Sequence, residues 1–70
     1  MYYDLYKCGR RIAKLRKEKG ITQEIMAADL GVATETIGRI ERGLRGTSVD
    51  MLLMMAEYLD TSVDYLVKGR

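Results

Sequence analysis

The sequence predicts an all-α fold, and three observations lead to this prediction. Proline, which interrupts helices, is absent from the 70 residues. Apolar residues recur at intervals of three and four along most of the chain, which places them on one face of a helix. Alternating β-branched residues, which are typical of strands, are scarce. Apolar residues form 47% of a chain that is too short to build two cores, so we expect one helical domain.

The first helix is expected over residues 4–19. Its apolar residues fall on one stripe, formed by Leu5, Cys8, Ile12 and Leu15, whereas basic residues occupy the rest of its surface. Gly20 follows as a C-terminal stop, because glycine readily adopts the left-handed conformation that ends a helix. We expect Cys8 to be a small buried apolar residue.

Two short helices follow, joined by a tight turn. Thr22 is a good N-cap for a second helix of about eight residues, which ends before Gly31. A third helix is expected over residues 34–42, ending before Gly43. The inward-facing residues of this pair are Met26, Ala27, Leu30, Val32, Ile37 and Ile40. Two short helices joined by a three- to four-residue turn that contains glycine form a helix-turn-helix arrangement.

A fourth helix begins after Ser48, which is a favourable N-cap. The residues expected to face inward from it are Val49, Leu52, Leu53, Met55, Ala56 and Leu59. The segment 60–62 then starts a short fifth helix around Val63 and Leu66. Asp60 and Asp64 lie near the start of that helix, where acidic residues act as caps, so we do not interpret them as a catalytic pair.

The composition excludes several classes of protein. The longest apolar run covers residues 51–56, far below the roughly 18 residues needed to cross a bilayer, and the N-terminus does not resemble a signal peptide. We therefore expect a cytoplasmic protein with no membrane partner. Cys8 is the only cysteine and histidine is absent, so no internal disulfide and no Cys/His zinc site can form. We expect no metal, no cofactor and no enzymatic activity.

The charge is distributed unevenly along the chain. Residues 1–46 hold ten basic and six acidic residues, a net charge of +4, whereas residues 47–70 hold two and four, a net charge of −2. This polarity suits a protein that turns one side to phosphates, although an ordinary solvated helix surface would show it equally well.

Residues 21–43 contain a set of positioned residues, namely Ile21-Thr22-Gln23-Glu24, Met26-Ala27, Leu30-Gly31-Val32, Thr36-Ile37 and Arg39-Ile40-Glu41-Arg42-Gly43. With these residues the segment resembles the Cro/repressor (xenobiotic response element type) helix-turn-helix family. The resemblance covers residues 10–67, so residues 1–9 would extend the first helix. It implies a five-helix, lambda-repressor-like domain in which residues 23–42 are the DNA-reading unit. The sequence departs from the family pattern at Ala33, Gly38 and Thr47, where a serine cap, a serine or similar residue, and a proline are common.

The resemblance implies which residues contact double-stranded DNA. Thr34, Glu35 and Arg39 would read bases in the major groove, and Arg39 could donate in a fork to guanine O6 and N7. Gln23 would bind a phosphate together with the helix N-terminus that it begins.

Arg42 and Arg45 flank the turn after the third helix and would reach further phosphates. Alternatives remain for several of these residues. Glu35 could serve only the helix dipole, Gln23 could simply face solvent, and either arginine could be surface charge without a role.

Arg16 and Glu41 have a different role in the resembling family, where this pair forms a partly buried salt bridge between the first and third helices. We therefore expect them to be structural, and not to contact DNA.

Apolar residues also stand at positions where the family usually carries polar ones. The expected dimer or partner surface consists of Met51, Met54, Tyr58 and Tyr65, and Ile25 is a further example. Apolar surface of this kind suggests a partner, and a homodimer would match two half-sites roughly 34 Å apart. Alternatively, Tyr2, Tyr3, Leu5 and Tyr6 fold back and cover the surface.

The leading hypothesis for function is a sequence-specific transcriptional regulator of a bacterium, a repressor that binds a palindromic operator through the third helix. The alternative is an antitoxin, whose apolar surface would bind a toxin protein while its helix-turn-helix represses its own operon.

Overall fold

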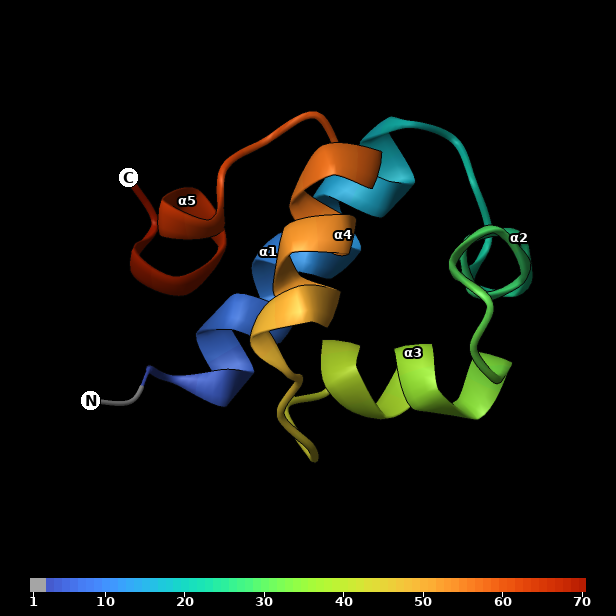
Figure 1. The fold of residues 1–70 in the computed structure, drawn as a ribbon, viewed down its shortest axis with the longest axis horizontal. Coiled ribbons are helices and arrows are strands. Elements are labelled where there is room, and N and C mark those ends of the chain that lie inside the picture. The colour runs from blue at the N-terminus through green and yellow to red at the C-terminus, as the bar shows by residue number, and fades with distance from the viewer. Residues whose placement is uncertain (1–2) are drawn as a thin grey trace.

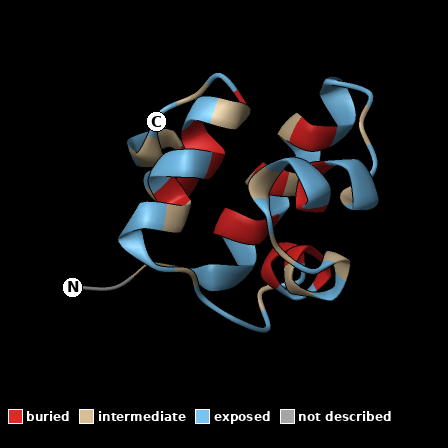
Figure 2. Cartoon of the chain, turned by 45° about the vertical axis from the view of Figure 1, so that its right-hand side comes forward, coloured by how far each residue is buried: buried red, intermediate tan, exposed pale blue. Residues whose placement is uncertain are grey.

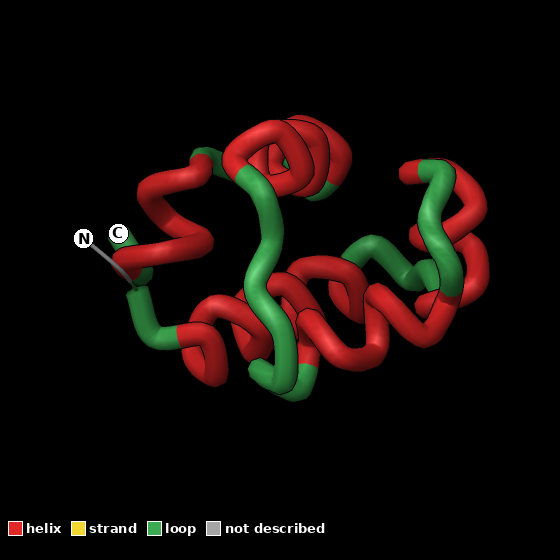
Figure 3. Tube along the Cα trace, turned by 60° about the horizontal axis from the view of Figure 1, so that its bottom comes forward, coloured by secondary structure: helices red, strands yellow, loops and turns green. Residues whose placement is uncertain are grey.

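The computed structural model describes residues 3–70, which form five α-helices and no strand (Figure 1). The helices are α1 (Leu5–Glu18), α2 (Gln23–Leu30), α3 (Thr34–Glu41), α4 (Val49–Tyr58) and α5 (Val63–Lys68). The predicted all-α, five-helix fold is confirmed. Short loops connect the helices, as the trace in Figure 3 shows.

Side-chain caps explain why the helices begin where the sequence predicts. Four helices have a cap whose oxygen accepts a backbone N–H from the first turn, at 3.0 to 3.1 Å. These caps are Asp4, Thr22, Ser48 and Ser62, for α1, α2, α4 and α5 in that order. The exception is α3, which begins after Ala33 and has no side-chain cap.

The turns after α2 and after α3 each depend on a glycine in the left-handed region. Gly31 ends α2 at φ 74°, and Gly43 follows α3 at φ 75°, a conformation that glycine adopts without steric penalty. At Gly43 the chain also passes close to the start of α1, because an added Cβ would lie 2.7 Å from the Cα of Tyr6.

All five helices contribute to a single core. Each provides one of the largest fully buried side chains, namely Ile12, Met26, Ile37, Met55 and Leu66. The buried segments face the interior between the helices in Figure 2. Burial of each such side chain contributes roughly 1.5–3 kcal/mol to folding. Cys8 also lies in this core as a free thiol, and burial raises the pKa of that thiol.

Two residues that we predicted to face inward from α4 are exposed. The exposed fractions of Val49 and Leu53 are 72% and 51%, whereas Leu52, Met55 and Leu59 are buried. The prediction was wrong because the apolar stripe on α4 is wider than the surface that neighbouring helices cover. Leu5, at the start of α1, is also exposed, because among the described residues only the loop before α4 lies beside it.

The packing places α3 along one edge of the molecule. It packs against α2 and α1, while α1 also packs against α5, and in Figure 1 α3 runs along the bottom with α2 beside its N-terminal end. Close approach of α1 and α3 requires Gly9, since an added Cβ would lie 2.6 Å from the carbonyl oxygen of Glu41. Nothing in the described helices is long and apolar enough to cross a membrane.

Candidate nucleic-acid interface

A cleft of about 290 Å³ lies where the start of α2 meets the outer face of α3. Its lining residues are Gln23, Thr34, Glu35, Gly38, Arg39 and Arg42. Five of the six residues that the sequence predicts to contact DNA are therefore neighbours in space. The sixth, Arg45, lies outside the cleft, in the loop between α3 and α4.

The α-helical repeat explains this grouping. The positions 34/35, 38/39 and 42 are spaced at three and four residues, so they share one side of α3. Ile37 and Ile40 occupy the other side and are buried in the core, which fixes the helix and turns its polar side outward. Glu35 and Arg39 are exposed, and Glu35 lies in the first turn of α3.

A buried ion pair joins α1 to the end of α3. Arg16 Nε donates to Glu41 Oε2 at 2.7 Å, and Arg16 Nη2 donates to Glu41 Oε1 at 3.1 Å. The two residues are 8% and 6% exposed. The hydrogen bond to Glu41 raises the pKa of Arg16 although burial opposes this, so the arginine stays charged. The two parallel bonds also fix the relative orientation of the side chains.

Two further hydrogen bonds extend this ion pair into a network. Arg16 Nη1 donates to the carbonyl oxygen of Ile21 at 2.8 Å, which fixes the loop before α2. Gln23 Nε2 donates to Glu41 Oε1 at 2.9 Å. Gln23, expected to contact a phosphate, is therefore bound to the same carboxylate as Arg16. No local sequence signal predicts this bond, because 18 residues separate its partners and they lie on different helices.

Gly38 forms the floor of the cleft. An added Cβ at this position would lie 3.4 Å from Arg42 Nη1 and 3.6 Å from Gln23 Oε1. The Gln23 carboxamide and the Arg42 guanidinium therefore lie beside the glycine backbone, and a larger residue would contact both.

The residues predicted as a dimer or partner surface contact different elements. Met51 and Tyr58 are half-buried, and Met54 is 44% exposed. The hydroxyl of Tyr58 donates to Asp29 Oδ2 at 2.6 Å, which joins α4 to the C-terminal end of α2. This hydrogen bond to a carboxylate raises the pKa of Tyr58.

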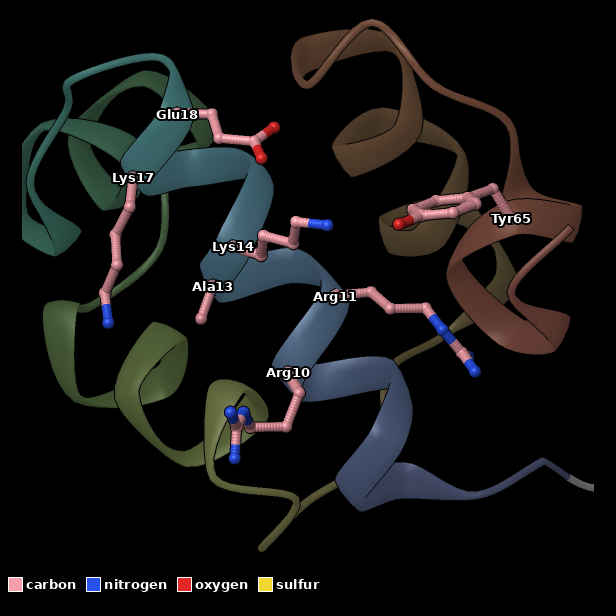
Figure 4. A pocket seen from close by; sticks show the side chains of 7 residues that line it. All are labelled: Arg10, Arg11, Ala13, Lys14, Lys17, Glu18 and Tyr65. Carbon is pink, nitrogen blue, oxygen red and sulfur yellow. The ribbon is translucent and has the colours of Figure 1, made fainter.

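Tyr65, the fourth of these residues, lies beside α1. It lines a cavity of about 590 Å³ whose other lining residues, Arg10, Arg11, Ala13, Lys14, Lys17 and Glu18, all belong to α1. In Figure 4 the Arg11 and Lys14 side chains extend from α1 on the side that faces Tyr65. Arg11 Nη1 also donates to the carbonyl oxygen of Leu66 at 3.0 Å, which attaches α5 to α1.

The N-terminal aromatic and apolar residues lie beside the loop before α4 and along α1. Tyr3 and Leu5 line a small cavity with Gly46 and Thr47 of the loop before α4. The hydroxyl of Tyr6 accepts a hydrogen bond from Arg10 at 2.9 Å. Tyr2, which we also considered as a cover, lies outside the described residues.

Comparisons with known proteins support one assignment. A family model described as helix-turn-helix matches residues 12–66. YazB of Bacillus subtilis (strain 168), described as an uncharacterized HTH-type transcriptional regulator, is 45% identical over 58 residues, which cover 83% of this chain and 84% of YazB. Other curated relatives are longer, and the chain spans about half of their length.

Two solved structures share the fold over most of their length. The restriction-modification controller protein C.AhdI from Aeromonas hydrophila superposes with a TM-score of 0.82 at 38% identity, covering 90% of this chain and 96% of that one. The P22 c2 repressor protein, solved in complex with synthetic operator 9T, gives a TM-score of 0.85 at 33% identity, with the same coverage of 90% and 96%.

These comparisons also decide between regulator and enzyme. The matching curated relatives are HTH-type transcriptional regulators, a class that acts by binding and not by catalysis, so the prediction that the chain is not an enzyme is confirmed. The family match over residues 12–66, the relative at 45% identity and the two shared folds agree: the chain belongs to the Cro/C1-type (xenobiotic response element) helix-turn-helix family of transcriptional regulators.

Proposed function

We propose that this protein is a repressor that binds a palindromic DNA operator, with α3 in the major groove. The observation that carries the proposal is the cleft between α2 and α3, which gathers amide, hydroxyl, carboxylate and guanidinium groups on one side of α3. The P22 c2 repressor, which has the same fold, was solved bound to a synthetic operator, and this supports the proposal.

Base recognition is assigned to the exposed side of α3. Arg39 is exposed, and its guanidinium can donate two parallel hydrogen bonds to guanine O6 and N7. Glu35 lies in the first turn, where its carboxylate can accept from cytosine N4, and Thr34 contacts an adjacent base edge.

Phosphate binding is assigned to residues around this helix. Gln23 begins α2, whose N-terminal N–H groups attract an anion. Arg42 lines the cleft, and Arg45 follows in the exposed loop. Each arginine that neutralises a phosphate releases about one counterion, so binding weakens as salt concentration rises.

Dimerisation is assigned to the apolar surface of α4 and α5. Met54 is exposed, with Met51 and Tyr58 beside it on α4 and Tyr65 on α5. A homodimer with two-fold symmetry would place two copies of α3 about one helical turn of DNA apart, roughly 34 Å, which requires a palindromic site.

The experiment that tests this function is selection of bound sequences from random duplex DNA, at a stated salt concentration, with the 70-residue chain. We expect enrichment of a palindrome with half-sites about 10 base pairs apart. The Arg39→Ala variant serves as the control, because it should lose preference at one position of each half-site. Failure to enrich any motif, with binding no tighter than about 10⁻⁶ M at physiological salt, would overturn the proposal.

A further inference from the structure

We infer that Glu41 is a positioning residue for DNA binding, which holds the carboxamide of Gln23 in place beside α3. The Arg16–Glu41 ion pair then does more than join two helices, because it also orients a side chain that contacts DNA. The inference rests on the proposed function, in which Gln23 binds a phosphate.

Glu41 accepts hydrogen bonds from residues of two other helices. Glu41 Oε1 accepts from both Gln23 Nε2, at 2.9 Å, and Arg16 Nη2, at 3.1 Å, while Glu41 Oε2 accepts from Arg16 Nε. The Glu41 side chain is 5% exposed and cannot move away from these donors into solvent. A carboxylate only accepts hydrogen bonds, so it selects the nitrogen end of the Gln23 carboxamide.

The hydrogen bond to Glu41 uses only one of the two hydrogens on the Gln23 carboxamide nitrogen. The other remains for an oxygen acceptor, which is what a phosphate offers. Because the carboxamide is already held in the free protein, less side-chain freedom is lost when DNA binds, and affinity increases.

Arg16 has its own part in this arrangement. An uncompensated carboxylate next to Gln23 would repel a phosphate. Arg16 donates to both oxygens of Glu41, including Oε1, which also accepts from Gln23. This compensates the charge of the carboxylate, so Glu41 can orient the amide without repelling the DNA. The carboxamide lies directly beside α3 at Gly38, where an added Cβ would be in van der Waals contact with Gln23 Oε1, at 3.6 Å.

The first test uses the free protein and one NMR signal. Gln23 is the only glutamine and the chain has no asparagine, so the protein has a single side-chain carboxamide. We expect its ¹⁵N order parameter to approach that of rigid backbone, about 0.85, and to fall below about 0.6 when Glu41 is removed. A carboxamide that is equally mobile with and without Glu41 would overturn the inference.

The variant for this test is Arg16→Met with Glu41→Leu, because apolar replacement of both partners of a buried ion pair usually preserves the fold. The matched control is Lys19→Met with Asp60→Gly. This control removes the exposed Lys19–Asp60 ion pair, leaves the net charge unchanged, and places glycine where φ is 57°. The control should leave the order parameter of Gln23 unchanged.

The second test is a double-mutant cycle on affinity for duplex DNA that carries the selected motif. We expect the apolar pair variant to bind about fivefold to tenfold more weakly, as for the loss of one hydrogen bond. In the Gln23→Ala background the same change should have almost no effect, because its target is already absent. If instead the pair variant and Gln23→Ala weaken binding by independent factors that multiply, the ion pair is purely structural and the inference is overturned. If no DNA is bound at all, the proposed function fails, and the NMR test alone decides whether Glu41 positions Gln23.

Discussion

The α2–α3 side and the α4–α5 side of this domain are held together in different ways. On the α2–α3 side, a buried carboxylate accepts hydrogen bonds from two other elements, and the polar residues beside it line a cleft. On the α4–α5 side, the buried contacts are apolar, the side-chain hydrogen bond between Tyr58 and Asp29 lies near the surface, and apolar residues such as Met54 remain exposed.

The two surfaces suit the two tasks proposed for them, which are DNA recognition and dimerisation. Recognition of a base sequence requires side chains at fixed positions, which a network of buried hydrogen bonds provides. Association with another protein surface requires exposed apolar area, which α4 retains. Substitutions on the two sides should therefore differ in their effects on stability and binding.

Removal of the buried carboxylate should have the largest effect. Glu41→Ala leaves the 8% exposed guanidinium of Arg16 without its partner, so the free energy of unfolding should fall by about 3 kcal/mol or more. Asp60→Gly is the control, since it removes only the exposed ion pair with Lys19 and should change stability by less than about 1 kcal/mol. Urea denaturation measures the free energy of unfolding of both variants. Equal losses of stability would show that the buried ion pair matters no more than the exposed one.

Loss of the arginine proposed to read bases should weaken DNA binding without unfolding the protein. Arg39 is exposed, so Arg39→Ala should leave the melting temperature unchanged. It should cost about 1–3 kcal/mol of binding free energy and relax preference at one base pair. Titration of the selected DNA and of a single-base variant measures this, and an undiminished preference would remove Arg39 from the reading face.

Charge on the α4 surface should weaken self-association. Met54→Lys with Tyr58→Lys introduces two cations beside the exposed apolar area, and we expect dimerisation to weaken by roughly tenfold or more. Val49→Lys with Leu53→Lys is the matched control on exposed residues of the same helix. Sedimentation of a dimeric wild type and of both variants measures self-association. An unchanged profile for Met54→Lys with Tyr58→Lys would show that this surface is not part of the interface.

Loss of the two arginines proposed to bind phosphates should alter salt dependence more than specificity. Arg42→Ala and Arg45→Ala should each weaken binding to all sequences alike, and reduce the slope of log K against log salt concentration by about 1. Affinity measured at several salt concentrations tests each residue. An unchanged slope would indicate surface charge with no contact to DNA.

The smallest effect is expected at the contact between α4 and α2. Tyr58→Phe removes the hydrogen bond to Asp29, and stability should fall by no more than about 1 kcal/mol, because the contact is near the surface. The pKa of Tyr58 is raised in the folded protein from its ordinary value of 10.0. The stabilisation is therefore complete below pH 10 and is lost as the pH rises through the raised value. Thermal unfolding measured below and above the raised pKa tests this. The difference in melting temperature between wild type and variant should disappear at the higher pH.

Local signals explain why the helix bounds could be predicted from the sequence. Thr22, Ser48 and Ser62 lie next to the apolar repeats that they cap, and Gly31 and Gly43 end the helices of the reading unit. Such signals need no knowledge of distant residues. The end of α3 differs slightly from the predicted range 34–42, since Arg42 is its C-cap.

Burial on α4 could not be predicted to the same degree. Val49 and Leu53 belong to an apolar stripe as regular as that of the core residues, but no neighbouring helix covers them. Helical periodicity gives the direction of a side chain, whereas burial also depends on where other helices end.

The interaction of Gln23 with Glu41 was beyond sequence reasoning for a related reason. The family resemblance pairs Glu41 with Arg16 and directs Gln23 to DNA, and neither statement implies a bond between Glu41 and Gln23. The bond follows from the crossing of α2 and α3, which brings residues 18 positions apart within 2.9 Å.

The cleft also determines how this protein can be redesigned. The side chains of Thr34, Glu35 and Arg39 take part in none of the side-chain hydrogen bonds found among the described residues, and Glu35 and Arg39 are exposed. These three positions can therefore be randomised together in a library with little loss of stability. Gln23 and Glu41 would have to stay unchanged in such a library, because their hydrogen bond joins α2 to α3 and so positions the helix that carries the randomised residues.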